Sequence, residues 1–450
     1  MIRMRCWAAA LCLVSVACGR SPFGIGGVAG GSGDGGAEDG ADDDPGGEEA
    51  DDGRDDDDDD GPDDDDDDDA SDTGEDACAG GPDVRNAWVY DGESLETVGE
   101  DILRHGDVLY MSGSAADGES TFLWLAAAQT DGTLLWEERL HPRLGTNLSG
   151  WRPVASRLAV AGDVLVYAGN TYDQIPIGLM GTILPIDDVV FPGPEVSGAM
   201  YYGVASIDGP VDLLLAGRDY GPVSEGARFE RFGGGDWIRN TVEAGSFHDI
   251  VAAVAILDDD SAIVAGRSND LPWIARIDLD AGDLRWSASV GQATFEVDTG
   301  AFWSVQLDDE RAYVSGFVYQ TKPKPDRDGS WSFGEVFVAA YDLEGGLEWT
   351  WQRSSTTARP GDANALTLGA DGTVFVAGEE SEFSDDAALF VSAFSPEGEV
   401  LWQLDDLGHG DVTGLLPVGI TPGDDGQLFV LTNTYHPDGL RRTTLVELCY

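Results

Sequence analysis

A block of about fifty residues recurs along this chain and limits the folds that it can adopt. The clearest copy reads GDANALTLGADGTVFVAG (361–378) and, after a loop, ALFVSAFSPEGEVLW (388–402). Each copy holds an apolar strand, a tight Asp/Gly turn, a β-branched strand ending in glycine, a third strand, a second turn and a strand with tryptophan. One four-stranded unit cannot bury both of its faces, so the copies must stack on one another. Radial stacking of such units predicts a β-propeller.

The number of copies of the repeated glycine position predicts the number of blades. It recurs in six copies, and threonine takes its place in a seventh: Gly113, Gly169, Gly217, Gly266, Gly316, Gly378 and Thr432. The last block, residues 412–450, contains only three strands, so we expect NAWVYDG (86–92) to supply the fourth. The predicted fold class is therefore all-β: a propeller of seven four-stranded blades, the last closed by an N-terminal strand.

The clearest copy of the repeat resembles the bacterial seven-bladed β-propeller repeat. In addition, ARIDLDAGDLRW (275–286) is similar to the tryptophan-docking repeat of pyrroloquinoline-quinone-type propellers. The resemblance covers roughly residues 86–450 and implies a fold, but it implies no single function, because such repeats occur in enzymes, scaffolds and adhesive surface proteins. We expect the tryptophans of the outer strands to pack between blades: Trp136, Trp237, Trp286, Trp349 and Trp402.

Residues 1–17 have the pattern of a signal peptide. Two arginines precede an apolar run from Cys6 to Val16, which is too short to span a membrane. SVAC (15–18) resembles a lipoprotein box that would place lipid on Cys18, although Ser15 stands where that pattern prefers leucine and ordinary small-residue cleavage also fits. We expect a protein of the cell envelope, at the outer membrane or cell surface, attached to membrane only by this lipid; secretion is the alternative.

Cysteine parity favours lipidation. If Cys18 carries lipid, Cys78 and Cys449 are the two thiols left after signal cleavage, and an oxidising compartment favours their pairing. Cys78 precedes the proposed closing strand and Cys449 lies at the end of the strand that it would join. We expect a disulfide at this seam, with two unrelated thiols as the alternative. Crosslinking so long a loop stabilises by about 5 kcal/mol in the chain-entropy model.

Residues 18–77 are predicted to be a disordered, lipid-anchored Asp/Gly-rich linker, followed by the propeller domain at 78–450. Residues 34–76 include 26 acidic residues, one arginine and no aromatic residue, so this segment cannot bury a core. The whole chain has a formal net charge of −60. Such a charge repels nucleic acid and anionic membranes, so neither is an expected partner.

Two His/Asp pairs are candidates for a site in the channel. His248 with Asp249, and His409 with Asp411, precede innermost strands and could hold a metal or supply a general base. Asp362 occupies the equivalent place without a histidine, which favours a turn role in which the carboxylate accepts backbone N–H groups.

Calcium is a weaker alternative, and no other cofactor is predicted. DLDAGD (278–283) and DRDGS (326–330) resemble Asp-rich calcium loops, but neither keeps the full ligand spacing, and DAGD also fits a hairpin turn. The sequence has no nucleophile elbow, zinc-protease motif or phosphate loop, and no vicinal cysteine pair of the quinoprotein type.

We therefore predict a non-catalytic, monomeric envelope lipoprotein that binds a protein or glycan. The alternatives are an extracytoplasmic enzyme with a site at the channel mouth, quinoprotein-like or metal-dependent, and a calcium-dependent adhesive protein. Binding is expected on the face that carries the connections from second to third strands and from fourth strands to the next blade, called here the long-loop face.

The strongest candidate on that face is the predicted loop YQTKPKPDRDGSWSFG (319–334). It holds the only two lysines of the chain, Lys322 and Lys324, beside Trp331 and Phe333. Exposed aromatic side chains beside a local positive charge favour partner recognition. The alternative is that these aromatic side chains fold back onto the blade.

Lipidation of Cys18 is testable by substitution. Wild-type protein expressed in a bacterium should enter the membrane fraction, whereas Cys18→Ser should be released or left unprocessed because its anchor is missing. Fractionation and mass spectrometry of the mature N-terminus measure this. Cys78→Ser is the matched control, and it should stay in the membrane fraction. Wild-type protein that is wholly soluble after ordinary signal cleavage would contradict the prediction.

Overall fold

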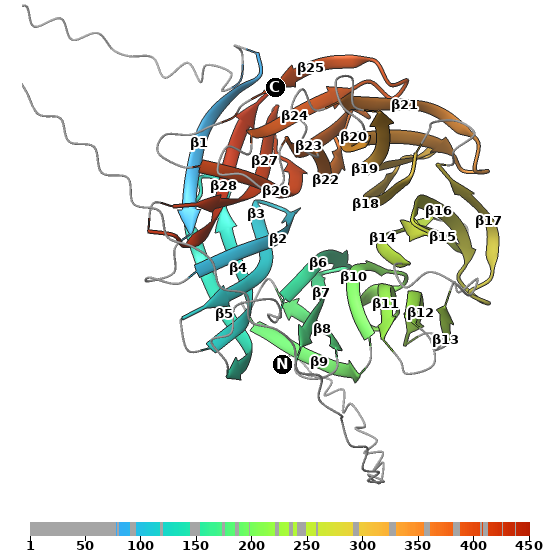
Figure 1. Ribbon diagram of the computed structural model, residues 1–450. Coiled ribbons are helices and arrows are strands. Elements are labelled where there is room, and N and C mark those ends of the chain that lie inside the picture. Colours follow the sequence, from blue (N-terminus) through green and yellow to red (C-terminus); the bar gives the residue numbers. More distant parts are fainter. Residues whose placement is uncertain are drawn as a thin grey trace, which may run out of the picture. The chain divides into compact units, whose positions relative to one another are not determined.

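The repeat forms seven antiparallel sheets of four strands each, arranged as the blades of a β-propeller (Figure 1). The chain divides into residues 1–71 and 72–450, and all described residues belong to the second unit. The computed structural model describes residues 78, 81–90, 96–117, 120–144, 154–172, 176–184, 189–197, 199–220, 225–233, 237–240, 249–257, 260–290, 297–323, 330–354, 361–380, 388–405, 407, 413–424, 426–436 and 438–450. These residues form no helix long and apolar enough to span a membrane.

Within six of the blades, strand order follows the sequence from the innermost strand outward. Blades one and two contain β2 (Glu96–His105), β3 (Val108–Ala116), β4 (Ser120–Gln129) and β5 (Leu134–Leu144), then β6 (Val154–Ala161), β7 (Val164–Tyr172), β8 (Pro176–Leu184) and β9 (Val189–Ser197). Blades three and four contain β10 (Ala199–Ser206), β11 (Leu213–Tyr220), β12 (Glu225–Phe232) and β13 (Trp237–Asn240), then β14 (Ile250–Leu257), β15 (Ser261–Ser268), β16 (Leu271–Asp278) and β17 (Leu284–Ser289). Blades five and six contain β18 (Thr299–Leu307), β19 (Arg311–Pro323), β20 (Ser330–Asp342) and β21 (Leu347–Ser354), then β22 (Gly361–Leu368), β23 (Val374–Glu380), β24 (Ala388–Phe394) and β25 (Val400–Leu404).

Blade seven combines strands from distant parts of the sequence. Its order is β1-β28-β27-β26, with β26 (Thr413–Pro422) innermost, then β27 (Gln427–Tyr435), β28 (Arg441–Cys449) and β1 (Asp83–Tyr90) outermost. The innermost strands of neighbouring blades contact one another all the way round, including β26 of blade seven with β2 of blade one. A single helical turn, η1 (Gly209–Val211), joins β10 to β11.

Apolar side chains fill the spaces between blades. In β15, Ile263 packs in a core cluster shared with blade five, whereas the next residue, Val264, packs in a cluster shared with blade three. Successive strand residues point to opposite faces of a sheet, and here a neighbouring blade covers each face. This explains why the second and third strands of blade four, β15 and β16, are largely apolar.

The repeated glycine lies inside the second strand rather than at its end, which corrects the interpretation from sequence. In blade four, β15 continues past Gly266 to Ser268, and the register of β14 shifts between Val251 and Ala253, at the position opposite. A Cβ atom at Gly266 would lie 2.1 Å from the carbonyl oxygen of Ile250. Glycine is therefore required because the bulged backbone of the innermost strand approaches it closely.

Two of the predicted outer-strand tryptophans donate hydrogen bonds to the next blade, whereas the side chain of Trp237 lies outside the described part of the structure. Trp286 of blade four donates its indole N–H to the carbonyl of Leu343 at 2.9 Å, and Trp349 of blade five donates to that of Pro396 at 2.8 Å. The indole of Trp88, on β1, packs in the same way against Gly132 of blade one, where an added Cβ would lie 2.2 Å from the ring. Trp88 thus gives blade seven the docking side chain that its other strands lack.

Two asparagines tie blades together through the bulges. Asn433 of blade seven accepts from the N–H of Gly99 at 2.7 Å and donates to its carbonyl at 2.9 Å, which links β27 to β2. Asn170 of blade two bonds both backbone groups of Tyr201 in blade three in the same arrangement. Each asparagine directly follows the repeated Gly or Thr position of its blade.

Substitution of Gly266 tests whether the repeat requires glycine at this position. Gly266→Ala should lower the free energy of unfolding by about 1–3 kcal/mol, because the added methyl group must displace the bulged backbone of β14. Urea denaturation measures the change. Ser287→Ala, at an exposed position of β17 in the same blade, is the control and should change it by less than about 0.5 kcal/mol. Equal stability of the two variants would show that the bulge yields without cost.

Candidate functional site

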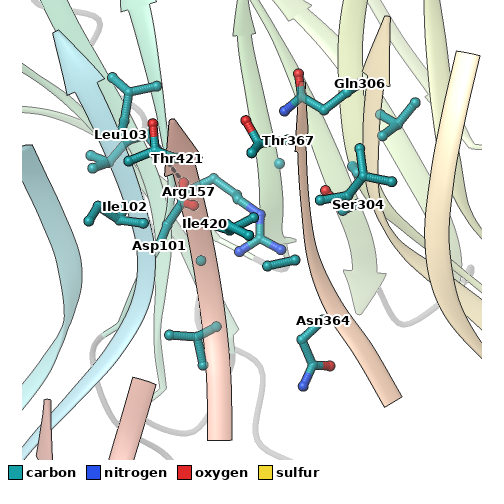
Figure 2. Close-up of a pocket in the computed structure, with 18 of the residues that line it drawn as sticks. Asp101, Ile102, Leu103, Arg157, Ser304, Gln306, Asn364, Thr367, Ile420 and Thr421 are labelled. Atoms are coloured by element: carbon teal, nitrogen blue, oxygen red, sulfur yellow. Dashed lines mark hydrogen bonds between the residues drawn. The ribbon is translucent and has the colours of Figure 1, made fainter. Parts of the chain in front are cut away.

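A narrow channel runs through the centre of the propeller, lined by the innermost strand of every blade (Figure 2). Its cavity has a volume of about 150 Å³. Blades three and four line it with apolar groups and glycine, whereas the other five blades supply polar side chains: Asp101, Arg157, Ser304, Gln306, Asn364, Thr367 and Thr421.

The guanidinium group of Arg157 crosses this channel. Arg157 lies on β6 of blade two, and its Nη1 donates to the carbonyl oxygen of Glu100 in blade one at 3.0 Å. Its Nη2 donates to the carbonyl oxygen of Trp303 in blade five at 3.3 Å. Both acceptors lie at the bulges of their strands, β2 and β18, where regular ladder pairing is interrupted. One cation therefore satisfies carbonyl groups on two blades that are not neighbours in the ring.

Two acidic residues of β2, Glu100 and Asp101, lie near Arg157. Asp101 accepts the backbone N–H of Leu158 at 2.8 Å, which joins blade one to blade two. Burial in the channel wall raises the pKa of Asp101, and the charge of Arg157 opposes that rise. Burial also raises the pKa of Glu100 to about 7, against the opposing charges of Arg157 and Arg441. At neutral pH the carboxyl group of Glu100, at the bulge of β2, is therefore near the midpoint of its titration.

The aspartates that were compared in the sequence make different contacts. Asp249 is almost fully buried and accepts the backbone N–H of Asn269 at 2.7 Å, in the turn between β15 and β16. This contact fits the turn role proposed for it. Asp362 instead accepts the indole N–H of Trp303 at 2.8 Å, next to the channel.

The remaining members of the two predicted His/Asp pairs, His248, His409 and Asp411, lie outside the described residues, as does Cys18. Their roles stay predictions. In the part of the chain that the structure describes, no three His, Cys, Asp or Glu side chains come together as a metal site would require.

The segment DLDAGD is a hairpin turn between β16 and β17. Asp278 accepts the backbone N–H groups of Asp280 and Ala281, each at 2.9 Å, and the guanidinium of Arg285. The pKa of Asp278 is lowered mainly by the hydrogen bond from the N–H of Ala281 and next by the hydrogen bond from Arg285. Because the carboxylate of Asp278 already accepts hydrogen bonds within the turn, its contacts favour a hairpin turn over a calcium loop. Most of DRDGS (326–330) lies outside the described residues.

Residues 319–334, predicted as a loop, are mostly β-structure. Strands β19 and β20 continue the blade as a two-stranded ribbon, in which Lys322 pairs with Trp331 and Phe333 pairs with Gln320. The proline and glycine residues of this segment suggested a loop, but pairing with the opposite strand prevails up to Pro323 and from Ser330. Lys324 lies outside the described residues. The register places positions 320, 322, 331 and 333 in one four-residue patch of paired strand, called here the ribbon tip.

Sequence reasoning missed Arg157 and Glu100. A signal for Arg157 was present: it and Asp101 each stand twelve residues before the repeated glycine of their blade, at a position that is Ser304 in blade five. Charged residues at one position of an apolar innermost strand indicate a common direction into the channel. Glu100 had no such signal, because the bulge that positions it depends on pairing with β3.

Comparisons with known proteins identify no relative by sequence: no family model matches the chain, and no curated protein matches it. Solved structures do match. The Dos1 propeller is 8% identical and matches 78% of each chain with a TM-score of 0.45. Drosophila Plexin A, in complex with Semaphorin 1b, is 10% identical over 82% of this chain and 87% of its own (TM-score 0.46).

The β-propeller domain of the Trilobed protease from Pyrococcus furiosus is 11% identical over 78% of this chain and 95% of its own, with a TM-score of 0.41. Likeness at this level carries no argument about function. The assignment of a seven-bladed propeller therefore depends on the seven sheets themselves.

The raised pKa of Glu100 predicts a pH dependence of stability. The folded state holds this proton more tightly than the unfolded chain, so the stabilisation is complete below about pH 4.5 and is lost as pH rises through about 7. Wild-type protein should lose up to about 3 kcal/mol relative to Glu100→Gln between pH 4.5 and pH 8, at about 1.4 kcal/mol per pKa unit. Urea denaturation across this range measures it.

The control for this test is Glu399→Gln, which removes an exposed carboxylate and should keep the wild-type slope. Carboxyl groups with lowered pKa, such as Asp278, change the free energy of unfolding mainly below pH 4, so they do not contribute to the change between pH 4.5 and pH 8. A slope unchanged by Glu100→Gln would exclude this group as the cause.

Proposed function

We propose that this chain is a non-catalytic envelope or surface protein, held to a membrane by lipid on Cys18, whose propeller binds a protein or glycan through the long-loop face. The observation that carries this proposal is the ribbon formed by β19 and β20. Each of these strands has 13 residues, more than any other strand of the described chain.

The ribbon extends beyond the blade that supports it. The innermost strand β18 pairs with β19 as far as Tyr319, and the outermost strand β21 pairs with β20 as far as Glu335. Beyond those points, residues 320–323 pair with residues 330–333 and with no other strand that the structure describes. The ribbon leaves the blade at the connection between its second and third strands, which is the long-loop face. A rigid sheet that projects a short ribbon is a common way to present recognition residues.

The composition of the ribbon supports recognition of an acidic or carbohydrate partner. Lys322 lies in the ribbon and Lys324 follows it in sequence; they are the only two lysines of a chain with 85 acidic residues, so this segment contrasts in charge with the rest of the protein. Lysine supplies attraction to carboxylate or sulfate groups, and Trp331 and Phe333 supply the large contact areas that dominate binding energies.

The central channel supports binding of a small substrate less well. Its cavity of about 150 Å³ is below the roughly 300–1,000 Å³ of ordinary small-molecule sites. The side chain of Arg157, which donates to Glu100 and Trp303, also lies in the middle of this cavity. We therefore place the binding activity on the ribbon.

Substitution at the ribbon tests this function. The triple variant Lys322→Ala, Lys324→Ala, Trp331→Ala should lose at least about tenfold in affinity for partners captured from envelope extracts, because it loses both the charge and the main aromatic area. Capture on immobilised protein followed by titration measures this. The melting temperature should stay nearly unchanged, since Lys322 and Trp331 lie beyond the last pairs that β18 and β21 make with the ribbon.

The matched control keeps the chemistry: Lys322→Arg, Lys324→Arg, Trp331→Phe should retain most of the binding. If the alanine variant binds as wild type, the ribbon is not the recognition site. If it unfolds, the ribbon belongs to the core of blade five, and the proposal fails for that reason.

A further inference from the structure

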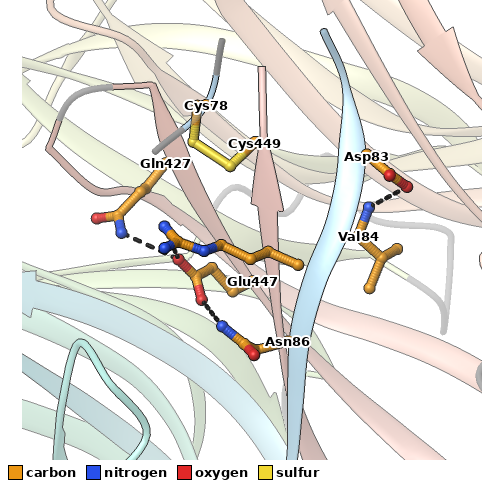
Figure 3. Close-up of a disulfide and its surroundings, with 8 residues drawn as sticks. Cys78, Asp83, Val84, Asn86, Gln427, Glu447 and Cys449 are labelled. Atoms are coloured by element: carbon orange, nitrogen blue, oxygen red, sulfur yellow. Dashed lines mark hydrogen bonds and ion pairs between the residues drawn. A yellow bond between two sulfur atoms is a disulfide. The ribbon is translucent and has the colours of Figure 1, made fainter. Parts of the chain in front are cut away.

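The disulfide between Cys78 and Cys449 joins a residue that precedes β1 to the end of β28 in blade seven (Figure 3). Their Cα atoms are 5.0 Å apart, although the residues are 371 positions apart in sequence. Cys449 is also the register partner of Asp83, the first residue of β1. The covalent bond therefore stands directly before the first backbone pair between β1 and β28.

The two strands at this point differ in how they are held. β1 is the outer edge of blade seven and pairs only with β28, whereas β28 pairs with β1 on one side and β27 on the other. Seven consecutive residues of β28, from Thr443 to Cys449, are buried. In β1 only Tyr90 is fully buried, and Asp83, Arg85, Asn86 and Val89 are exposed.

Attachment along β1 is also uneven. At the far end, Trp88 packs on Gly132 and the Tyr90 hydroxyl donates to the carbonyl of Gly132 at 3.1 Å. Nearer to Cys78, the Asn86 amide donates to Glu447 at 2.6 Å, and Val84 and Ala87 are only partly buried where they pack on the core cluster. The end of β1 beside the disulfide is thus the more exposed end, since Asp83, Arg85 and Asn86 all face solvent there.

These facts fix how the seam would respond to a pull on the preceding chain. Without the disulfide, tension at residue 78 would act on the Asp83 end of β1 and separate its pairs one at a time, ending at Tyr90. With the disulfide, the same tension passes from Cys78 to Cys449, into a strand that is bonded on both sides. The bond thus removes load from β1.

We propose that the Cys78–Cys449 disulfide is a redox-sensitive latch that carries tension from the N-terminal segment past β1 and keeps this edge strand in blade seven. Reduction by a dithiol opens it: the Sγ–Sγ bond accepts two electrons and two protons, and the dithiol closes to its own disulfide. Opening leaves β1 held by non-covalent contacts, which include its pairs with β28, the Asn86–Glu447 hydrogen bond and the contacts at Gly132. This proposal does not depend on which partner the long-loop face binds.

Pulling single molecules by their two ends tests the latch. The full chain carries enzymatically joined tags before its first residue and after Tyr450, so that the disulfide lies on the direct path between them. Oxidised protein should extend without any step from the propeller. Folded protein treated with dithiothreitol should show a first step of about 60 Å, the contour of residues 79–95 at roughly 3.5 Å per residue, before larger unfolding steps.

Two variants separate the latch from packing. Cys78→Ser should show the 60 Å step without reductant, whereas Trp88→Ala with the disulfide intact should show no step, because the covalent path still bypasses β1. A reduced protein in which β1 leaves only together with a whole blade, or at the force that unfolds the propeller, would overturn the proposal.

Amide hydrogen exchange tests the same latch without force. On reduction of the folded protein, the amides of Val84 to Tyr90 should exchange at least about tenfold faster, while those of β27 stay protected. Equal protection of β1 in the oxidised and reduced proteins would show that its pairing with β28 suffices and that the disulfide is no latch.

Discussion

The structure depends on the packing of one blade against the next. Each sheet is apolar on both faces, as Ile263 and Val264 of β15 show by packing toward opposite neighbours. A row of such sheets would leave two apolar faces in water, and only a ring leaves none. The contacts between blades seven and one follow the same pattern as the others: Asn433 bonds Gly99, and Trp88 packs on Gly132.

The bulges of the innermost strands connect this packing to the channel. Each bulge brings backbone close to the repeated glycine on one side and interrupts ladder pairing on the other. In blades one and five, Arg157 supplies the donors for the carbonyls at these points. The same side chain lies near Asp101 and Glu100, whose pKa values are raised by burial. Fold geometry thus concentrates charge in a channel that is too small for an ordinary substrate.

The contacts that hold blade seven closed and the ribbon proposed for recognition lie in different parts of the propeller. The disulfide and the docking contacts of β1 lie at the outer edge of blade seven, where they hold the strand that comes from the other end of the sequence. The ribbon of β19 and β20 belongs to blade five and extends past its own sheet. Substitutions at the ribbon tip therefore need not disturb the core, which makes the proposed binding role testable apart from folding.

The sequence alone determined the repeat, its count and its main anchors. Glycine spacing, the outer tryptophans and the parity of Cys78 and Cys449 are local signals, and seven sheets, the docking of Trp286 and Trp349 and the disulfide agree with them. Only the tertiary structure determined where the bulges lie, because the register of a strand depends on the strand that pairs with it. It also decided the bond from Arg157 to Trp303, since that pair is 146 residues apart and meets across the ring. The ribbon of residues 319–334 was read as a loop because proline and glycine dominate local preference, whereas pairing between β19 and β20 overrides it.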